Sequence, residues 1–479
     1  MINKKIVVIS MLILLLTSTI LPVINSQSFN TLNPTIKSSG ENNYCDLLII
    51  TPAKFKPALQ PLVSHKNKFG VKTVLVTLEY IYQDILFAND NAEKVKFFIK
   101  KAYDEGGIKY VLLVGGIKKQ FSENEVYWCP VRYIHLEDRW GGGITNYDEP
   151  RFLTDLYFAD IYDSENNFQS WDDDGDGIYG EWFDNNSAED VLDLYPDVYV
   201  GRLPCRNRLE VRNVVRKIIN YEKENITGNN WFNRIVAAAG DTYPGGINEG
   251  EQEAQDSLDQ MPGFSHIKLW ASTGNLTGPR DVIKEINKGC GFLLFEGHGS
   301  PTCWTTHPTE DFKTDIFGIT NYQIPFLFNR NKIPICVINA CHNSMFNVSF
   351  GHSSWTGPYN IYECISWRFV NKRNGGAIAT LGNTGLGYGP KDKLNPELGG
   401  CNPVLVKYFF EQYGSNKTDI LGEMWGEAIS SYLEEYPIMW HENSYNDTSL
   451  DAKTVAQWLL IGDPSLKIGG YDPINKNEI

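Results

Sequence analysis

Short apolar runs that alternate with helix-like segments constrain the fold of this chain more than any other feature of its 479 residues. The apolar runs span 46–51, 72–78, 110–114, 199–202, 235–239, 292–295, 335–339 and 377–381. The segments with helical spacing span 56–69, 92–103, 209–221, 280–287, 361–369, 403–413 and 420–433. Apolar runs separated by helices are typical of parallel strands covered on both faces. The sequence therefore predicts an α/β fold with parallel sheets flanked by helices.

The order of these segments predicts two α/β subdomains. The first spans 44–225 and contains a loop-rich acidic stretch, and the second spans 226–470. A polar linker rich in Asn and Ser, residues 27–43, precedes the first subdomain, and residues 471–479 form a short tail.

The amino terminus has the pattern of an export signal. Lys4 and Lys5 precede the apolar run 6–16, and small or polar residues follow. This pattern predicts a signal peptide over 1–26 and a secreted or extracellular protein. Apolar character continues to Ile24, close to the length of a membrane span. An uncleaved anchor, and with it a cell-surface location, therefore stays open as the alternative.

Charge and cysteine content exclude two classes of function. The formal net charge is −15 and the sequence pI is about 5.1, and Lys and Arg form no cluster along the chain. A nucleic-acid-binding protein needs such a cluster, so no nucleic-acid partner is expected. The nine cysteines include no CxxC pair, which excludes a zinc ribbon. Their odd number leaves at least one thiol free in an exported protein.

Two of the predicted strands end in segments that can perform chemistry. The run 292–295 leads into Glu-Gly-His-Gly-Ser, which contains His298, and the run 335–339 leads into Ala-Cys-His-Asn, which contains Cys341. Catalytic groups gather at the carboxyl ends of parallel strands. If these strands are neighbours, His298 and Cys341 lie within reach of each other.

A cysteine and a histidine in contact can cleave a peptide bond. Cysteine attacks as the thiolate, and an adjacent imidazolium stabilises that thiolate and later protonates the leaving amine. The tetrahedral intermediate needs amide donors for its oxyanion, and the amides of Gly299 and Cys341 are the candidates. This chemistry requires no cofactor. A lone cysteine on a strand is more often a buried apolar residue, as we expect for Cys290 and Cys336.

The two segments resemble the gingipain-type peptidases, the C25 family of the caspase-like clan. The matching residues are His298, Gly299, Ser300, Trp304, Ala340, Cys341 and Asn343. The sequence departs from the family at Ser344, where glycine is usual. The resemblance also covers 197–202 and 460–466, and extends over roughly residues 45–470.

The resemblance implies a caspase/gingipain-like fold and a cysteine endopeptidase that acts on protein or peptide substrates. It implies that Asp197 orients or charges His298, with a structural salt bridge to Arg202 or Arg206 as the alternative. Tyr388 and Trp304 are candidates for substrate binding.

Gingipains accept basic P1 residues through an acidic pocket, and Glu210 is a weak candidate for the matching acid. The neighbouring Arg206 and Arg208 argue against it.

An acidic stretch predicts a structural calcium site. Asp172, Asp174 and Asp176 stand at positions 1, 3 and 5 of a calcium-type loop, and Ile178 at position 7 offers its carbonyl oxygen. Glu181 or Asp184 could close the site, and Asp160 and Asp163 are further candidate ligands. Position 12 is not a glutamate, so the loop is not a complete EF-hand, and a solvated acidic turn is the alternative.

Two other functions compete with the peptidase hypothesis. The first is a non-catalytic surface or adhesion module that is stabilised by calcium. The second is a metal-dependent hydrolase that binds its metal through His298, Cys303 and His307, although no HExxH motif accompanies these residues.

Overall fold

The computed structural model describes residues 44–119, 125–136, 151–183, 186–243, 246–349, 361–389, 400–444 and 447–473. The expected signal peptide and linker lie outside these ranges, as does the tail beyond residue 473. All described residues belong to one compact unit, residues 36–479. None of the helices in the described ranges combines the length and the apolar character needed to cross a membrane.

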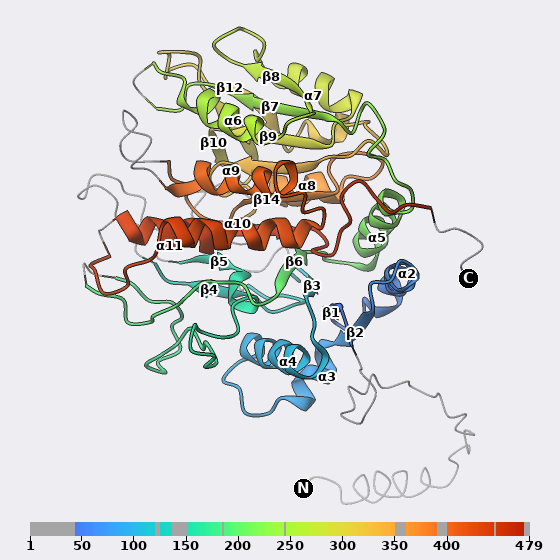
Figure 1. Ribbon diagram of the computed structural model, residues 1–479, viewed down its shortest axis with the longest axis vertical. Coiled ribbons are helices and arrows are strands. Elements are labelled where there is room, and N and C mark those ends of the chain that lie inside the picture. The colour runs from blue at the N-terminus through green and yellow to red at the C-terminus, as the bar shows by residue number, and fades with distance from the viewer. Residues whose placement is uncertain are drawn as a thin grey trace, which may run out of the picture. The chain divides into compact units, whose positions relative to one another are not determined.

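A ten-stranded sheet forms the centre of the fold, in the order β2-β1-β3-β6-β15-β14-β13-β9-β7-β8 (Figure 1). The first half contains β2 (Thr73–Thr77), β1 (Leu47–Thr51), β3 (Tyr110–Val114), β6 (Tyr199–Leu203) and β15 (Trp458–Ile461). The second contains β14 (Ala379–Asn383), β13 (Ile335–Asn339), β9 (Phe292–Glu296), β7 (Arg234–Ala239) and β8 (Ser265–Trp270). Strands are parallel within each half, and the halves meet where β15 pairs antiparallel with β14 and parallel with β6.

The α/β class predicted from the sequence is confirmed, but the subdomain arrangement differs from the expectation. The two expected subdomains share one sheet. The strand β15, which belongs to the second subdomain by sequence, lies beside strands of the first.

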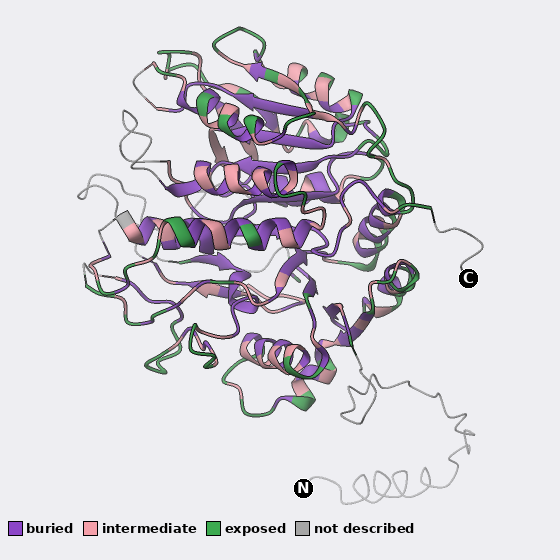
Figure 2. Ribbon diagram, viewed as in Figure 1, coloured by how far each residue is buried: buried purple, intermediate pink, exposed green. Residues whose placement is uncertain are grey.

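Successive side chains of each strand in the second half point to opposite faces of the sheet, so both faces are apolar. Helices cover both of these faces. In β9, Phe292 and Leu294 belong to the main core with α6 (Glu249–Asp259), α9 (Cys401–Gly414) and α10 (Leu421–Glu435). Leu293 and Phe295 point to a smaller core with α7 (Pro279–Lys288) and α8 (Ile365–Asn371). Figure 2 shows the central strands of the large sheet as buried, whereas the helices also carry exposed and half-buried residues.

The first half carries α2 (Lys56–Lys68), α3 (Leu78–Asp84), α4 (Asn91–Gly106) and α5 (Arg208–Glu222), and α11 (Asp447–Ala456) precedes β15. A small antiparallel sheet follows β9 and contains β10 (His298–Ser300), β11 (Cys303–Thr306) and β12 (Ile316–Thr320). The remaining elements are the pair β4 (Arg132–Ile134) and β5 (Phe152–Thr154) and the short 3-10 helices η1 (Leu156–Phe158) and η2 (Ile324–Phe326).

A buried ion network ties the segment after β15 to the helices of the first half. The fully buried ammonium of Lys66 on α2 lies 2.6 Å from Glu222 on α5 and 2.9 Å from Asp463. It also donates a hydrogen bond of 3.0 Å to the carbonyl oxygen of Ser465. His65 adds a contact of 3.0 Å to Glu222. The network joins segments that lie far apart in sequence.

We expect Lys66→Met to lower the free energy of unfolding by about 3–5 kcal/mol, because Glu222 and Asp463 would stay buried without their cation. Urea denaturation measures the change. The matched control is Lys100→Met, whose exposed pair with Asp104 should contribute less than about 1 kcal/mol. Equal effects of the two substitutions would contradict the role of the network.

Candidate active site

The carboxyl ends of β9 and β13 form the centre of the candidate site. The two strands are parallel neighbours, and Asn339 pairs with Glu296 in their ladder. The condition stated from the sequence, that these two strands be neighbours, is met. His298 and Cys341 each follow two residues later, and both line a cleft of about 350 Å³.

The ring of His298 is oriented by a backbone carbonyl. Its Nε2 lies 2.7 Å from the carbonyl oxygen of Thr242, in the segment after β7. A carbonyl oxygen can only accept, so Nε2 carries a proton and Nδ1 is the nitrogen left to exchange one. The rings of Tyr243 and His307 flank the imidazole, at centroid distances of 5.9 and 5.4 Å.

The sulfur of Cys341 is half-buried, at the start of a tight turn. The amide of Gly387 lies 3.4 Å from Sγ and donates to it, and the thiol lies 3.8 Å from the Gly387 carbonyl oxygen, to which it can donate. The next residue, His342, is buried and has a φ of 57°, in the left-handed region. Its amide donates to the carbonyl oxygen of Gly385 at 2.9 Å. The loop after β14 therefore holds this turn by two hydrogen bonds, one to the sulfur and one from the amide of the next residue.

The turn also contacts the β10–β11 hairpin, where Gly299 is required by space. The side-chain amide of Asn343 donates to the carbonyl oxygens of Ser300 (2.7 Å) and Cys303 (2.9 Å). A Cβ on Gly299 would lie 2.6 Å from Asn343 Oδ1 and 2.8 Å from the carbonyl oxygen of Cys341. Only glycine lets the hairpin come this close to the cysteine.

The structure accommodates Ser344, where the C25 pattern has glycine. Its hydroxyl lies 2.9 Å from that of Ser366, within hydrogen-bonding distance, and its amide donates to the carbonyl oxygen of Asn383 at 2.8 Å. The departure from the family pattern is therefore absorbed by a buried polar contact behind the turn.

Two carboxyl groups lie in the same cleft. Glu253 on α6 and Glu296 at the end of β9 both line it. Glu296 is only 4 % exposed, and burial together with the negative charge of Glu253 raises its pKa well above the ordinary value. The side-chain amide of Asn339 donates to Glu296 at 2.5 Å. The cleft therefore has an acidic wall close to the cysteine.

Asp197 lies at the same edge of the sheet but far from His298. It precedes β6, and β15, β14 and β13 separate β6 from β9. At about 4.8 Å between neighbouring strands, the separation amounts to roughly 19 Å. Its carboxylate accepts hydrogen bonds from the amides of Ile161 (2.7 Å) and Tyr162 (2.9 Å). The expectation that Asp197 orients His298 is corrected: Asp197 anchors a loop of the first half.

The arginines considered as partners of Asp197 bind other acids. Arg202 pairs with Asp155 at 2.7 Å. Arg206 pairs with Glu210 at 3.1 Å. Glu210 is therefore engaged by a cation, and it is not among the residues that line the cleft.

The two candidates for substrate binding have different positions. Tyr388 is half-buried and lines the cleft, and its contact with substrate stays a prediction. Trp304 is fully buried and packs against Phe295 at a centroid distance of 5.1 Å. Trp304 is therefore corrected to a core residue beneath the hairpin, because an enclosed indole cannot touch a substrate.

Sequence reasoning missed Thr242, Glu253 and Gly387, which all line the cleft. Thr242 follows the end of β7, so the rule that sites form at strand ends could have indicated it. Glu253 lies on α6 and reaches the cleft only because this helix packs against β9. The sequence does not reveal that packing.

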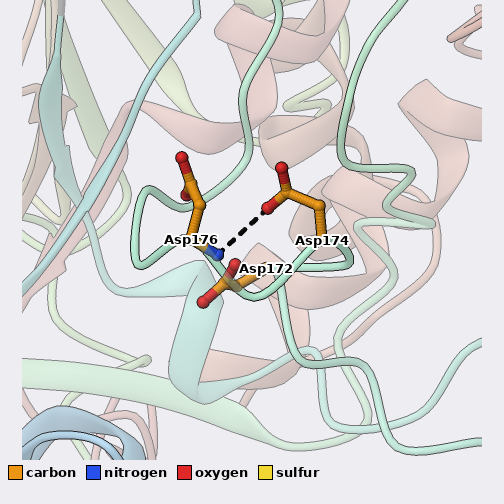
Figure 3. A group of neighbouring side chains, drawn as sticks. All are labelled: Asp172, Asp174 and Asp176. Carbon is orange, nitrogen blue, oxygen red and sulfur yellow. Dashed lines mark hydrogen bonds between the residues drawn. The ribbon is translucent and has the colours of Figure 1, made fainter.

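The carboxylates of Asp172, Asp174 and Asp176 converge, as the calcium-type loop requires (Figure 3). One oxygen from each lies within 4.8 Å of the others. The loop is closed by hydrogen bonds such as that from the amide of Asp176 to Asp174 Oδ1, at 3.1 Å. Glu181 is 8 % exposed, and its Oε2 has no hydrogen-bond partner among the described residues. Ile178 follows in the same loop.

The structure does not support the metal-hydrolase alternative, because the three proposed metal ligands do not lie close together. In the described part of the chain, the three loop aspartates are the one group of such side chains close enough to share a metal ion. His298, Cys303 and His307 do not form such a group, although all three are described.

An α/β sheet whose strand ends bring a cysteine and a histidine to one cleft is the arrangement of a cysteine peptidase. The model of Peptidase family C25 matches residues 41–469, and the chain belongs to this family. The resemblance to gingipain-type peptidases seen in the sequence is thereby confirmed.

Curated relatives come from Porphyromonas gingivalis. The chain is 22 % identical to a gingipain R2 over 306 residues, which cover 63 % of this chain and 32 % of that protein. It is 21 % identical to the protein named Lys-gingipain W83 over 350 residues, covering 72 % of this chain and 16 % of that protein. The matched region is thus about a third or less of each relative.

Solved structures show the same fold. The crystal structure of the Arg-specific cysteine proteinase gingipain R aligns with a TM-score of 0.58 at 18 % identity, covering 90 % of this chain and 79 % of that one. The complex of the RgpB pro- and mature domains from Porphyromonas gingivalis also gives 0.58, at 19 % identity, covering 88 % and 79 %.

Proposed function

We propose that this chain is an exported cysteine endopeptidase in which Cys341 is the nucleophile and His298 the proton-transfer group. The observation that carries the proposal is that both side chains line one cleft at the carboxyl ends of adjacent strands. Export rests on the basic and apolar pattern of residues 1–26.

The reaction follows from the hydrogen bonds of the site. The Cys341 thiolate attacks the carbonyl carbon of the peptide, and the amides of Gly299 and Cys341 are suited to hold the oxyanion. The C–N bond breaks as His298 gives its Nδ1 proton to the leaving amine. Water then hydrolyses the thioester, loses a proton to His298, and releases the acid with the thiolate restored. The carbonyl of Thr242 takes the orienting role.

We expect Cys341→Ala to abolish peptide hydrolysis and His298→Ala to lower kcat by on the order of 10²–10⁴, the usual range for a positioned acid–base group. Cleavage of a peptide library measures both. The matched control is Cys303→Ser, which replaces the half-buried thiol on β11 and should retain activity. If Cys341→Ala keeps activity within tenfold of the unmodified enzyme, the assignment is wrong.

The adhesion-module hypothesis makes the opposite prediction in the same assay. It requires no hydrolysis by the unmodified protein and no reaction of Cys341 with a peptidyl chloromethylketone. Labelling that is lost in Cys341→Ala favours the peptidase.

The acidic wall of the cleft favours a basic P1 residue. Glu253 and Glu296 lie beside the reactive groups, and no Lys or Arg is among the described residues that line the cleft. Two crowded carboxyls share a proton, so the pair keeps a net negative charge that a P1 cation can neutralise. The names of the relatives, Arg-specific for one and Lys-gingipain for another, agree with this proposal.

We expect Glu253→Gln to lower kcat/KM by about 10²-fold for substrates with Arg or Lys at P1, because burial holds the pKa of Glu296 high and Glu253 then supplies most of the negative charge that a P1 cation meets. Substrates with Gln or Met at P1 should change far less. Asp256→Asn removes an exposed charge from the same helix and is the control. An equal loss for basic and neutral substrates would exclude Glu253 as a specificity residue.

We also propose that Ca²⁺ binds Asp172, Asp174 and Asp176, with Ile178 and Glu181 completing the site. Converging carboxylates and the unpartnered Oε2 of Glu181 support the proposal. Carboxylates held this close repel each other, and oxygen-rich loops of this spacing suit a hard divalent cation.

We expect calcium to raise the melting temperature and a chelator to lower it, since a ligand at a hundredfold excess over its Kd stabilises the fold by about 2.7 kcal/mol. Asp174→Ala should remove this dependence. Glu165→Ala deletes an exposed carboxylate from a nearby turn and should keep it. The same melting temperature with calcium and with chelator would leave the loop as a solvated turn.

A further inference from the structure

A second cavity lies at the edge of the sheet opposite the catalytic cleft. Its walls are α5, the loop before β13 and the loop before β14, so it sits at the amino ends of these strands. Its volume is about 370 Å³, and its polar lining comprises Arg216, Asn220, Arg330, Asn331 and Asn374, above the buried Lys217. No Asp or Glu is among the described residues that line it. Guanidinium groups beside carboxamides, without a carboxylate, suit an oxyanion.

Further cations surround this cavity. Lys332 and Arg373 are exposed and Lys372 is half-buried, on the same two loops. No described carboxylate forms an ion pair with these three side chains, or with Arg216 and Arg330. Arg216 contacts the carboxamide oxygen of Asn213 at 3.2 Å. In a chain with a net charge of −15, this edge concentrates positive charge with which no described carboxylate pairs directly. An external anion can do so.

The floor of the cavity is a buried amine that contacts no acidic side chain among the described residues. Lys217 Nζ donates to backbone carbonyl oxygens, among them those of Val370 (2.6 Å), Gly375 (3.1 Å) and Ala377 (2.8 Å). Burial and the charge of Lys372 lower the pKa of Lys217 to about 7. A bound anion would favour the charged form of this amine.

Two wall residues have left-handed backbone conformations, and that of Arg330 is unfavourable. Arg330 has a φ of 49° and Asn374 a φ of 59°, both in the left-handed region. Arginine rarely adopts this conformation, and such strain is concentrated at binding sites. The side-chain amide of Asn329 fixes the two loops together by donating to Gly376, at 2.8 Å.

Two exposed phenylalanines adjoin the cations. Phe326 is 57 % exposed and Phe328 is 63 % exposed. Their backbone is pinned by Asn287, whose Oδ1 accepts from the Phe328 amide at 2.6 Å and whose amide donates to the Phe326 carbonyl at 3.2 Å. The Lys372 ammonium lies 5.5 Å from the Phe328 ring centroid. Exposed aromatic rings flanked by Lys and Arg are typical of surfaces that enter the interface of an anionic membrane.

We propose that this edge docks on an anionic lipid surface, with a headgroup phosphate in the cavity between Arg216 and Arg330 and with Phe326 and Phe328 inserted beside it. The exposed rings favour a lipid interface over a soluble acidic protein. An acidic protein would pair with the cations alone, and the phenylalanine rings would add nothing to that pairing. The cleft lies on the other edge, one strand length of about 17 Å away, and stays open to substrate. The proposal is independent of the peptidase assignment.

Cosedimentation of the full chain with lipid vesicles tests the proposal. Vesicles of phosphatidylcholine alone are compared with vesicles that also contain phosphatidylglycerol, at low and high salt. We expect binding to the anionic vesicles only, weakened by salt. Arg216→Gln with Arg330→Gln should lower the partition coefficient about thirtyfold, at about fivefold per charge near the surface. Phe326→Ser with Phe328→Ser should also lower it.

The charge-matched control is Lys109→Gln with Lys268→Gln, two exposed lysines outside this edge, which should bind as the unmodified chain does. Melting temperatures verify that every variant is folded. Equal binding of the arginine variant and the control would overturn the proposal. So would binding of inorganic phosphate or of polyglutamate without binding of anionic vesicles, since the site would then serve a soluble anion or an acidic protein.

Discussion

The pairing of β15 between β6 and β14 is the constraint on which the rest of the fold depends. This strand, the last in the described chain, joins two parallel half-sheets that run in opposite directions. Close backbone contact is needed at the junction: the amide of Gly462 donates to the Arg202 carbonyl at 3.0 Å, and a Cβ on Gly201 would lie 2.6 Å from the Gly462 carbonyl oxygen. The chain then continues to Asp463, which pairs with the buried Lys66 and so fixes the junction from outside the sheet.

The opposite directions of the two half-sheets explain why the sequence resemblance wrongly suggested that Asp197 lies near His298. Because the halves are antiparallel, the amino end of β6 lies at the same edge as the carboxyl ends of β9 and β13. Asp197 is therefore on the catalytic edge, but three strands intervene. The ring of His298 instead contacts the backbone carbonyl of Thr242, a group that any residue could offer. A backbone partner leaves no signature in the amino-acid sequence, so only the fold reveals it.

The sequence predicted those features that are local. Apolar runs located β1, β3, β9 and β13 to within a residue or two, and the glycine-flanked His298 and the Ala-Cys turn followed directly from two of them. It did not predict β8, whose residues are mostly exposed or half-buried at the sheet edge and lack an apolar run. Nor did it predict a cluster of cations, because Arg216, Arg330 and Arg373 are distant in sequence and meet only when strands β13 and β14 align.

The two edges of the second half differ in charge for a reason built into its topology. After a parallel strand the chain enters a helix amino terminus, and it returns from a helix carboxyl terminus to begin the next strand. One edge therefore collects strand ends, helix amino termini and Cys341, the proposed nucleophile, which would benefit from nearby amide donors as a thiolate. The other edge collects the carbonyl-rich ends of α7 and α8, which attract cations. Lys217 shows this attraction directly, because its ammonium group donates a hydrogen bond to the Val370 carbonyl at the end of α8. The acidic cleft and the basic opposite edge are thus two consequences of one arrangement of strands and helices.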